Sequence, residues 1–286
     1  MNDRAGVSAV IVNWNTRELL RACLQSLANS LPPPDEIVVV DNASADGSAA
    51  MVADAFPEVT LIANPDNRRY AAANNQGIAH ARGDLVWLLN PDTEVAADTL
   101  ATLIRLLECD QQLAAVTCRL IDPVTRRVQP SVRTFPTPLA LWIEALGLAR
   151  LFPRSRLGGQ YRMTWWDYDD EREVEQPMTS CLLLRRAAAT PLGWFDEAFP
   201  LYFNDVDLCY RLRQAGWKIR FTPATEVIHH LGASTRQVRA EAVQASHRGL
   251  LRFYRKHYRG RLPELVYAAT VALILFSGWV RGRLAQ

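Results

Sequence analysis

The first 120 residues alternate short runs of β-branched and apolar residues with longer stretches of helical periodicity. This alternation is typical of βαβ units, in which a helix connects two parallel strands of one sheet. It predicts one half of a doubly wound α/β fold. The predicted strands are 8–12, 36–40, 59–62 and 85–89, and the predicted helices are 16–28, 48–55 and 71–81.

Two polar segments follow predicted strands directly, Asp41-Asn42-Ala43-Ser44 and Asn90-Pro91-Asp92-Thr93. In open α/β sheets, ligands lie outside the carboxyl ends of the strands. A carboxylate at the first segment could bind a nucleobase or ribose, and one at the second could bind Mg²⁺ or Mn²⁺, which prefer oxygen ligands. Each segment could instead cap a turn, or in the second case the helix expected at 95–107.

The chain is less regular beyond residue 120. We expect a helix from Asp205 to the Gly216 stop, followed by strands at 218–221 and 226–228. Asp205 would stand at the positive end of this helix, where a carboxylate remains ionised and could take a proton from a hydroxyl. Asp205 and Asp207 could also serve only to complement the helix dipole. A histidine after the last strand could add a ligand to a metal ion at Asp92, although a lone histidine is more often structural.

Composition excludes several classes of function. Lys and Arg total 32 and Asp and Glu total 30, so a net charge of +2 gives no reason to expect nucleic acid as a partner. The five cysteines are scattered and odd in number, which argues against a disulfide framework or a zinc site. The start of the chain lacks the pattern of an export signal, so we expect the catalytic part in the cytoplasm.

The segment 265–280 is almost wholly apolar and has arginines on both sides. It is shorter than the about 20 residues that a membrane-spanning helix needs. One interpretation is a helix docked on the core. The other, which we favour, is a membrane-associating helix whose basic flanks are attracted to anionic lipid, on the cytoplasmic side of the membrane.

Seven short motifs occur in a characteristic order between residues 7 and 258. They are Val12-Asn13-Trp14-Asn15, Asp41-Asn42-Ala43-Ser44, Asn74-Asn75-Gln76-Gly77, Leu89-Asn90-Pro91-Asp92, Phe195-Asp196-Glu197, Asp205-Val206-Asp207-Leu208 and the segment from His229 to Ser234. Together they resemble the family 2 inverting glycosyltransferases, and within them the rhamnosyltransferase-like branch.

The resemblance implies a GT-A fold, in which a Rossmann-like nucleotide-binding sheet is fused to a smaller acceptor-binding region. On this basis residues 1–258 form one glycosyltransferase domain. Its nucleotide-sugar-binding half covers about 7–120, and its acceptor-binding and catalytic half covers 121–258. Residues 259–286 would form the basic and apolar membrane-associating helix.

The resemblance also implies a role for individual residues. Asp205 would be the general base, and Asp92 and His229 would hold a divalent metal, with His230 as the adjacent alternative. Trp194, Asp207 and Arg211 would face the acceptor. The nucleotide-sugar would contact the polar residues of the strand ends and of the helix at 71–81, namely Asn13, Asn15, Asp41, Asn42, Asn74, Asn90 and Asp92.

The reaction implied is a single in-line displacement, in which Asp205 deprotonates the acceptor hydroxyl and the metal stabilises the leaving nucleotide diphosphate. By resemblance the leading donor is dTDP-rhamnose, and UDP-hexoses are the second choice. The apolar segment 265–280 and its basic flanks favour a lipid-linked or cell-envelope glycan as the acceptor. A nicotinamide dehydrogenase or a sugar nucleotidyltransferase is disfavoured because no glycine-rich segment follows the first strand.

Three residues depart from the family pattern: Asn204 where a Glu is usual, Arg69 where a Gly is usual, and Ser180-Cys181 where a Gly-Ala pair is usual. Asn204 removes a charge beside Asp205, and Arg69 brings a bulky cation into a loop that favours glycine. Ser180 would narrow the donor pocket. These departures motivate the alternative hypothesis of a degenerate transferase that binds a nucleotide-sugar or glycan without turnover.

Overall fold

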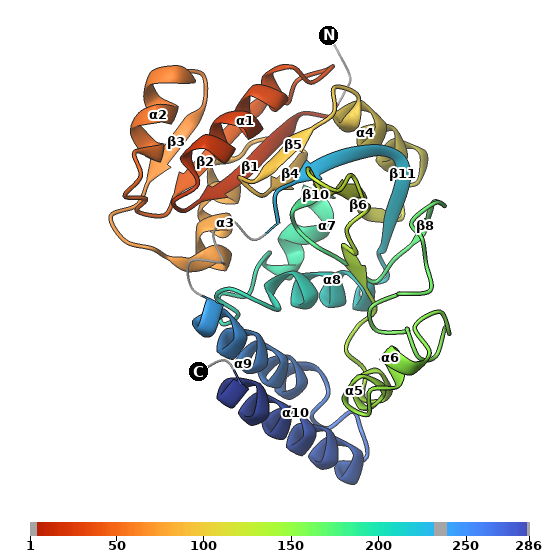
Figure 1. The fold of residues 1–286 in the computed structure, drawn as a ribbon. Coiled ribbons are helices and arrows are strands. Elements are labelled where there is room, and N and C mark those ends of the chain that lie inside the picture. The colour runs from red at the N-terminus through yellow and green to blue at the C-terminus, as the bar shows by residue number, and fades with distance from the viewer. Residues whose placement is uncertain (1–4, 232–238, 285–286) are drawn as a thin grey trace.

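The computed structural model describes residues 5–231 and 239–284. Within these residues a nine-stranded sheet has the order β3-β2-β1-β4-β10-β6-β11-β5, with β8 beside β11. Helices cover both faces of this sheet, and the C-terminal helices α9 and α10 lie side by side at one end of the molecule (Figure 1). The α/β class predicted from the sequence is confirmed.

The strands are β1 (Val7–Asn13), β2 (Glu36–Asp41), β3 (Thr60–Ala63), β4 (Leu85–Leu89), β5 (Thr93–Val95), β6 (Leu113–Ile121), β7 (Val132–Arg133), β8 (Arg172–Glu173), β9 (Gln176–Pro177), β10 (Cys181–Arg185) and β11 (Lys218–His229). The helices are α1 (Arg17–Ala28), α2 (Ser48–Ala55), α3 (Arg69–His80), α4 (Thr99–Cys109), α5 (Pro138–Ala145), α6 (Leu148–Leu151), α7 (Arg186–Ala189), α8 (Asn204–Gln214), α9 (Arg239–His257) and α10 (Glu264–Leu284), with a 3-10 turn η1 (Thr190–Leu192). In the first 90 residues each predicted element is present, with ends that differ by at most two residues.

The sheet packs between two apolar cores because successive residues of a strand point to opposite faces. In β1, Ala9 and Ile11 join the core under α1, α2 and α4, whereas Val10 joins the core under α3 and α8. Helix α1 buries Leu20, Cys23, Leu24 and Leu27, whose spacing places them on one face.

Strand register brings the polar segments together. β1 pairs in parallel with β2 on one side, where Asn13 lies opposite Asp41, and with β4 on the other, where Ile11 lies opposite Leu89. The chain therefore leaves β2 and β4 on either side of the end of β1. This is the reversal of strand order at which open α/β sheets bind ligands.

Two predictions beyond residue 90 were wrong in detail. The helix expected at 95–107 starts only at Thr99, because residues 93–95 form β5 and pair with the end of β11. Asp92 therefore precedes a strand and does not cap a helix. The two short strands expected at 218–221 and 226–228 form one strand, β11, whose register with β6 shifts between Thr222 and Glu226.

Helix α10 covers the segment predicted to be an apolar C-terminal helix. Its inner face packs on α9 and α5, where Trp142 donates a hydrogen bond to the buried Thr270 hydroxyl at 3.3 Å and Gly278 lies against His247. Its outer face exposes Leu275 and Trp279. Among the helices of residues 5–231 and 239–284, none combines the length and apolarity needed to cross a bilayer.

Candidate active site

A pocket of about 350 Å³ opens where β1, β4 and β11 end. Its wall brings together five of the predicted site residues, although they are up to 187 positions apart in the sequence (229 minus 42). These five are Asn42, Asn90, Asp92, Asp205 and His229. The pocket therefore joins the strand ends of the first half to the acidic helix α8 of the second.

Asp92 and His229 face each other across the base of the pocket. The Nε2 atom of His229 lies 3.4 Å from Oδ1 of Asp92, and both side chains are buried. Gln129 holds the other side of the ring, with Oε1 2.8 Å from Nδ1 of His229 and Nε2 donating to the His229 carbonyl at 2.8 Å. Because the amide nitrogen of Gln129 serves the carbonyl, its oxygen accepts from Nδ1. When the ring is neutral, its lone pair is therefore on Nε2, the nitrogen nearer Asp92.

His230 is turned away from this pair. Its Nε2 lies 2.7 Å from Oε1 of Glu94, while its backbone N–H donates to the carbonyl of Asp92 at 2.8 Å. Of the two adjacent histidines, His229 is thus the one that approaches Asp92. The remainder of this motif, Gly232 to Ser234, lies outside the described residues.

Three predicted nucleotide contacts are not among the residues that line the pocket. Asn13 is fully buried and donates to Oδ1 of Asp41 at 2.8 Å, and Asp41 also accepts from the backbone N–H of Ser44 at 2.9 Å. Asn15 accepts from the backbone N–H of Ala45 at 2.8 Å. In this arrangement the three side chains shape the loops after β1 and β2, so the sequence motif is assembled as a hydrogen-bonded unit.

Asn74 is likewise not among the residues that line the pocket. It is buried on α3 and donates to the backbone carbonyl of Tyr70 at 2.9 Å. Tyr70 itself lines the pocket, and its hydroxyl lies 2.9 Å from the Thr179 hydroxyl and 3.3 Å from Oδ1 of Asn90. Burial raises the pKa of Tyr70, and the nearby carboxylates of Asp205 and Asp92 raise it further. The Tyr70 hydroxyl therefore stays protonated between the two acids.

Asp205 enters the pocket from the first turn of α8. The sequence predicted that the helix end would keep this carboxylate ionised, but burial raises its pKa, and the hydrogen bond from the Val206 N–H and the charge of Arg133 oppose that rise only in part. The helix dipole is therefore outweighed by the loss of water around the group. A carboxylate with a raised pKa is a stronger base once ionised.

The side-chain amide of Asn204 makes hydrogen bonds that suit this position before Asp205. Its Nδ2 donates to the carbonyls of Leu201 at 2.9 Å and Phe199 at 3.3 Å, and its Oδ1 accepts from the N–H of Asp205 at 2.7 Å. An ionised glutamate could not make the two donor contacts. The departure from the family pattern therefore holds the loop before α8 against the helix.

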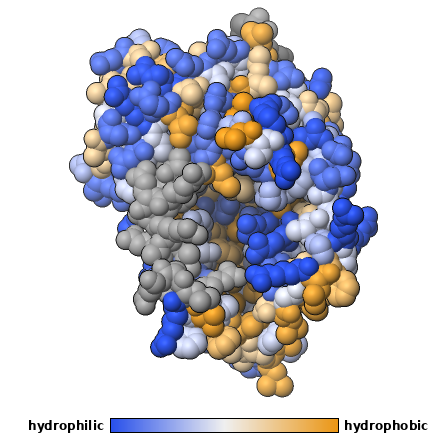
Figure 2. All heavy atoms as spheres, viewed as in Figure 1, coloured by the Kyte–Doolittle hydropathy of each residue, from blue (hydrophilic) through white to orange (hydrophobic). Residues whose placement is uncertain are grey.

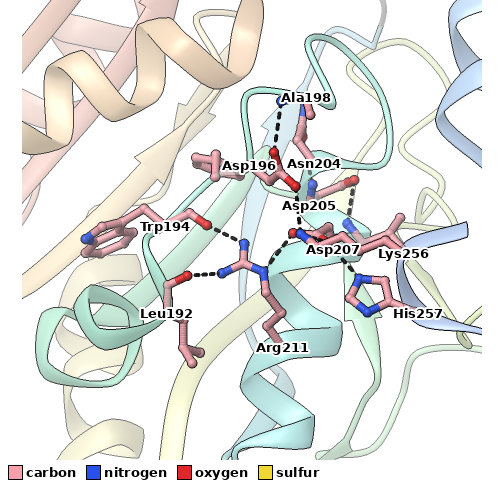
Figure 3. Close-up of polar contacts among 12 residues, drawn as sticks. Leu192, Trp194, Asp196, Ala198, Asn204, Asp205, Asp207, Arg211, Lys256 and His257 are labelled. Atoms are coloured by element: carbon pink, nitrogen blue, oxygen red, sulfur yellow. Dashed lines mark hydrogen bonds and ion pairs between the residues drawn. The ribbon is translucent and has the colours of Figure 1, made fainter. Parts of the chain in front are cut away.

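Trp194, Asp207 and Arg211, which the sequence predicted to face the acceptor, are not among the residues that line the pocket. Asp207 has no exposed surface, and its carboxylate accepts from Arg211 Nε, Lys256 Nζ and His257 Nε2, each at 2.7 Å (Figure 3). Arg211 in turn donates to the backbone carbonyls of Leu192 and Trp194. These three residues brace α8 against α9 and the 192–194 turn.

The other two departures alter the pocket in distinct ways. Arg69 has a φ of +68°, so this position has the left-handed backbone that favours glycine. Arg69 is among the residues that line the pocket, so it brings a cationic residue to the pocket wall. Ser180 also lines the pocket, and its hydroxyl accepts from Nδ2 of Asn90 at 3.0 Å. Both fill space that a glycine would leave open.

The sequence reasoning missed several residues of the site. Gln129 orients His229 from 100 positions away in the chain, and no local pattern marks it. Tyr70, Thr179 and Tyr202 line the pocket from segments that carry no motif of their own. Tyr70 was the one within reach of prediction, because it stands one helical turn before Asn74.

The sequence profile described as "Glycosyl transferase family 2" matches residues 8–166, more than half of the chain. The chain belongs to glycosyl transferase family 2. It is therefore a glycosyltransferase, and the strand order and pocket described above are its GT-A scaffold.

Relatives and solved structures agree with this assignment. The chain is 29% identical to N-acetylglucosaminyl-diphospho-decaprenol L-rhamnosyltransferase of Mycobacterium tuberculosis, over 88% of this chain and 84% of that protein. Its fold is similar to that of the mannosyltransferase PcManGT from Pyrobaculum calidifontis in complex with GDP-Man and Mn²⁺, with a TM-score of 0.62, 19% identity and coverage of 95% and 69%. It is also similar to GalNAc-T7 with UDP, GalNAc and Mn²⁺, with a TM-score of 0.64, 16% identity and coverage of 89% and 48%.

Proposed function

We propose that this glycosyltransferase moves rhamnose from dTDP-rhamnose to a lipid-linked glycan of the cell envelope, with inversion at the sugar. The observation that carries the proposal is that one pocket is lined by both Asp205 and the Asp92–His229 pair. The choice of sugar and acceptor is supported by the name of the mycobacterial relative.

The metal ion of this proposal is Mg²⁺ or Mn²⁺, held by Asp92 and His229. Among the described residues no group of three or more His, Cys, Asp or Glu side chains could hold an ion. A two-residue site fits an ion that takes further ligands from a bound diphosphate. The ring orientation fixed by Gln129, with Nε2 toward Asp92, is the arrangement found in metal-ligating histidines. When bound, the ion would supply positive charge for the departing diphosphate.

In the proposed reaction, Asp205 takes the proton from the acceptor hydroxyl. The protein orients this base through Asn204, whose Oδ1 binds the Asp205 N–H. Tyr70 lines the same pocket, and because burial raises its pKa its hydroxyl keeps its proton and can donate a hydrogen bond to a sugar oxygen. Asn90 and Asn42 line the same wall and offer amide groups to the donor.

We further propose that the protein acts at the cytoplasmic face of a membrane. Large apolar side chains are exposed on α5, α6 and α10, and hydrophobic surface gathers at the end of the molecule where these helices lie (Figure 2). The exposed residues include Leu139, Leu146, Leu151, Phe152, Leu275, Phe276 and Trp279. An apolar face of this kind, with arginines nearby, suits the interface of an anionic membrane.

Calorimetric titration with dTDP and with UDP, each with and without Mn²⁺, tests the donor site. We expect binding of dTDP that depends on Mn²⁺ and is lost in Asp92→Ala. Absence of binding for both nucleotides would refute the transferase site proposed here.

Turnover separates the transferase from a protein that only binds. The assay follows release of dTDP from dTDP-rhamnose in the wild-type protein and in Asp205→Asn. Equal rates in the two proteins, together with intact nucleotide binding, would favour the degenerate binding protein suggested by Asn204 and Arg69.

A further inference from the structure

Helix α9 carries a row of four basic residues on one face. Arg248, Arg252, Arg255 and Lys256 are spaced by four, three and one positions, so they lie along one side of the helix. All four are exposed, and all four line a second cavity of about 780 Å³. The row is therefore a concave cationic surface.

This second cavity adjoins the active site. Leu201 and Tyr202 line both cavities, so the 199–203 segment is the wall between them. Asp205 comes two positions after that segment, in the first turn of α8. A molecule lying on the basic row could therefore reach past this wall with one end close to the proposed base.

The arginines of the row lack carboxylate partners among the described residues. Lys256 is different, because its ammonium lies 2.7 Å from both Asp196 and Asp207. Arg252 stacks near the ring of Phe199, with 5.8 Å between guanidinium carbon and ring centre. Like charges one helical turn apart destabilise an isolated helix. The row is thus unfavourable for the helix alone and suits an anionic ligand.

The fold holds this row firmly in place. A Cβ atom on Gly249 would lie 3.0 Å from the Tyr202 carbonyl and from the Phe203 ring, so glycine lets α9 approach the shared wall closely. On the opposite side of α9, Phe253 and Tyr254 are fully buried. His257 is tied to Asp207 on α8. The guanidinium groups are therefore presented from a fixed helix.

We propose that Arg248, Arg252 and Arg255 bind the diphosphate of the lipid-linked acceptor, an inference that rests on the proposed function. Arginine suits phosphate oxygens through paired N–H donors. The diphosphate would lie on α9, the sugar would pass Tyr202 toward Asp205, and the lipid chain would leave toward the apolar surface of α10.

A bulk anionic lipid is a poorer occupant of the same row. Phospholipid headgroups need no route to the catalytic pocket, whereas the shared wall of Leu201 and Tyr202 places the row next to Asp205. A glycan acceptor without phosphate would leave the cationic row unused. Of these three ligands, only the acceptor diphosphate accounts for both the positive charge of the row and its place beside the active-site pocket.

The test compares two probes by calorimetry. One is N-acetylglucosaminyl diphosphate joined to a farnesyl chain, and the other is the same sugar on the same chain without phosphate. The variant Arg248→Gln/Arg252→Gln/Arg255→Gln is compared with a charge-matched control, Arg82→Gln/Arg105→Gln/Arg154→Gln, whose exposed arginines lie outside both cavities. Arg252→Gln alone serves as a milder variant if the triple variant does not fold.

We expect the wild-type protein and the control to bind the diphosphate probe at least about tenfold more tightly than the phosphate-free probe, as one lost charge-assisted contact predicts. The α9 variant should lose most of this preference and still bind dTDP with Mn²⁺. A preference that survives in the α9 variant, or a wild-type protein that shows none, would overturn the proposal.

Two further measurements separate the alternatives. If the α9 variant keeps the phosphate preference but no longer binds vesicles containing phosphatidylglycerol, the row contacts membrane lipid and the proposal is wrong. If the wild-type protein fails to bind dTDP, the proposed transferase site is refuted, while the probe comparison still decides whether α9 binds a diphosphate.

Discussion

Helix α8 presents two aspartates to two different surroundings. Asp205 faces the active-site pocket, where burial raises its pKa. Asp207 lies two residues further along the helix. Burial would raise its pKa too, but the hydrogen bond from His257 and the charge of Arg211 lower that pKa to about 2. The side of α8 that faces the pocket thus keeps a carboxylate poised to take a proton. The side that faces α9 uses its carboxylate as a permanent anion.

The difference teaches that neighbours, and not the helix end, set the two pKa values. It predicts that changes on the pocket side reduce activity with little loss of stability. Changes on the α9 side should reduce stability with little loss of activity per folded molecule.

The largest effect is expected from Asp205→Asn. Loss of a general base should lower kcat by about 10²–10⁴-fold. Because a raised pKa means that the folded state disfavours the ionised form, the substitution should not destabilise the protein at pH 7. In the wild-type enzyme, kcat/KM should rise with pH through a pKa above the ordinary aspartate range, since only ionised Asp205 accepts the proton. An unchanged kcat in Asp205→Asn would show that Asp205 is not the general base.

Gln129→Met tests the pocket side through a residue that touches no substrate. His229 would lose the partner that fixes its ring, and Mn²⁺ affinity should fall by about 10–100-fold, the effect typical of such second contacts. Titration of Mn²⁺ in the presence of dTDP measures it, with the exposed Gln111→Met as control. A metal affinity equal to that of the control would show that Gln129 does not orient a ligand.

Asp207→Asn tests the α9 side. A pKa lowered to about 2 from 3.8 corresponds to about 2 kcal/mol of stability. For a carboxyl group with a lowered pKa, this stability is present above the unfolded pKa near 4 and is lost as the pH falls toward 2. Urea unfolding should therefore show a deficit of about 2 kcal/mol at pH 7 that narrows between pH 4 and pH 2. A large loss of kcat without this deficit would contradict the comparison.

The smallest effect is expected at Arg69, whose φ of +68° strains a residue with a side chain. Arg69→Gly should raise the free energy of unfolding by less than about 1 kcal/mol, because relief of strain is partly offset by the greater freedom of glycine in the unfolded chain. Arg69→Asn removes the cation and places at this position a residue that adopts the left-handed backbone conformation readily. Weaker dTDP binding in both variants would assign the guanidinium to the donor diphosphate, whereas unchanged binding would assign Arg69 to the loop alone.

Much of the donor half could be predicted because its signals are local. Strands such as β1 and β4 are continuous apolar runs, and polar residues follow at the carboxyl ends of β2 and β4. Parallel strand order then places Asp41 and Asp92 at one edge of the sheet. The alternation of strand and helix periodicity, together with the polar residues at the ends of the strands, was sufficient to predict this half of the fold.

The roles within the second half depend on contacts between distant segments. The motif Asp205-Val206-Asp207 shows two equivalent acids, and only the packing of α9 against α8 makes one an ion-pair anchor and leaves the other in the pocket. Likewise, Gln129, in the segment between β6 and β7, contacts His229, whereas His230 turns to Glu94. The sequence by itself determined the α/β class, the family and the edge of the sheet that carries the site. The tertiary structure decided which side chains reach the pocket, because burial and pairing depend on neighbours that the linear pattern does not contain.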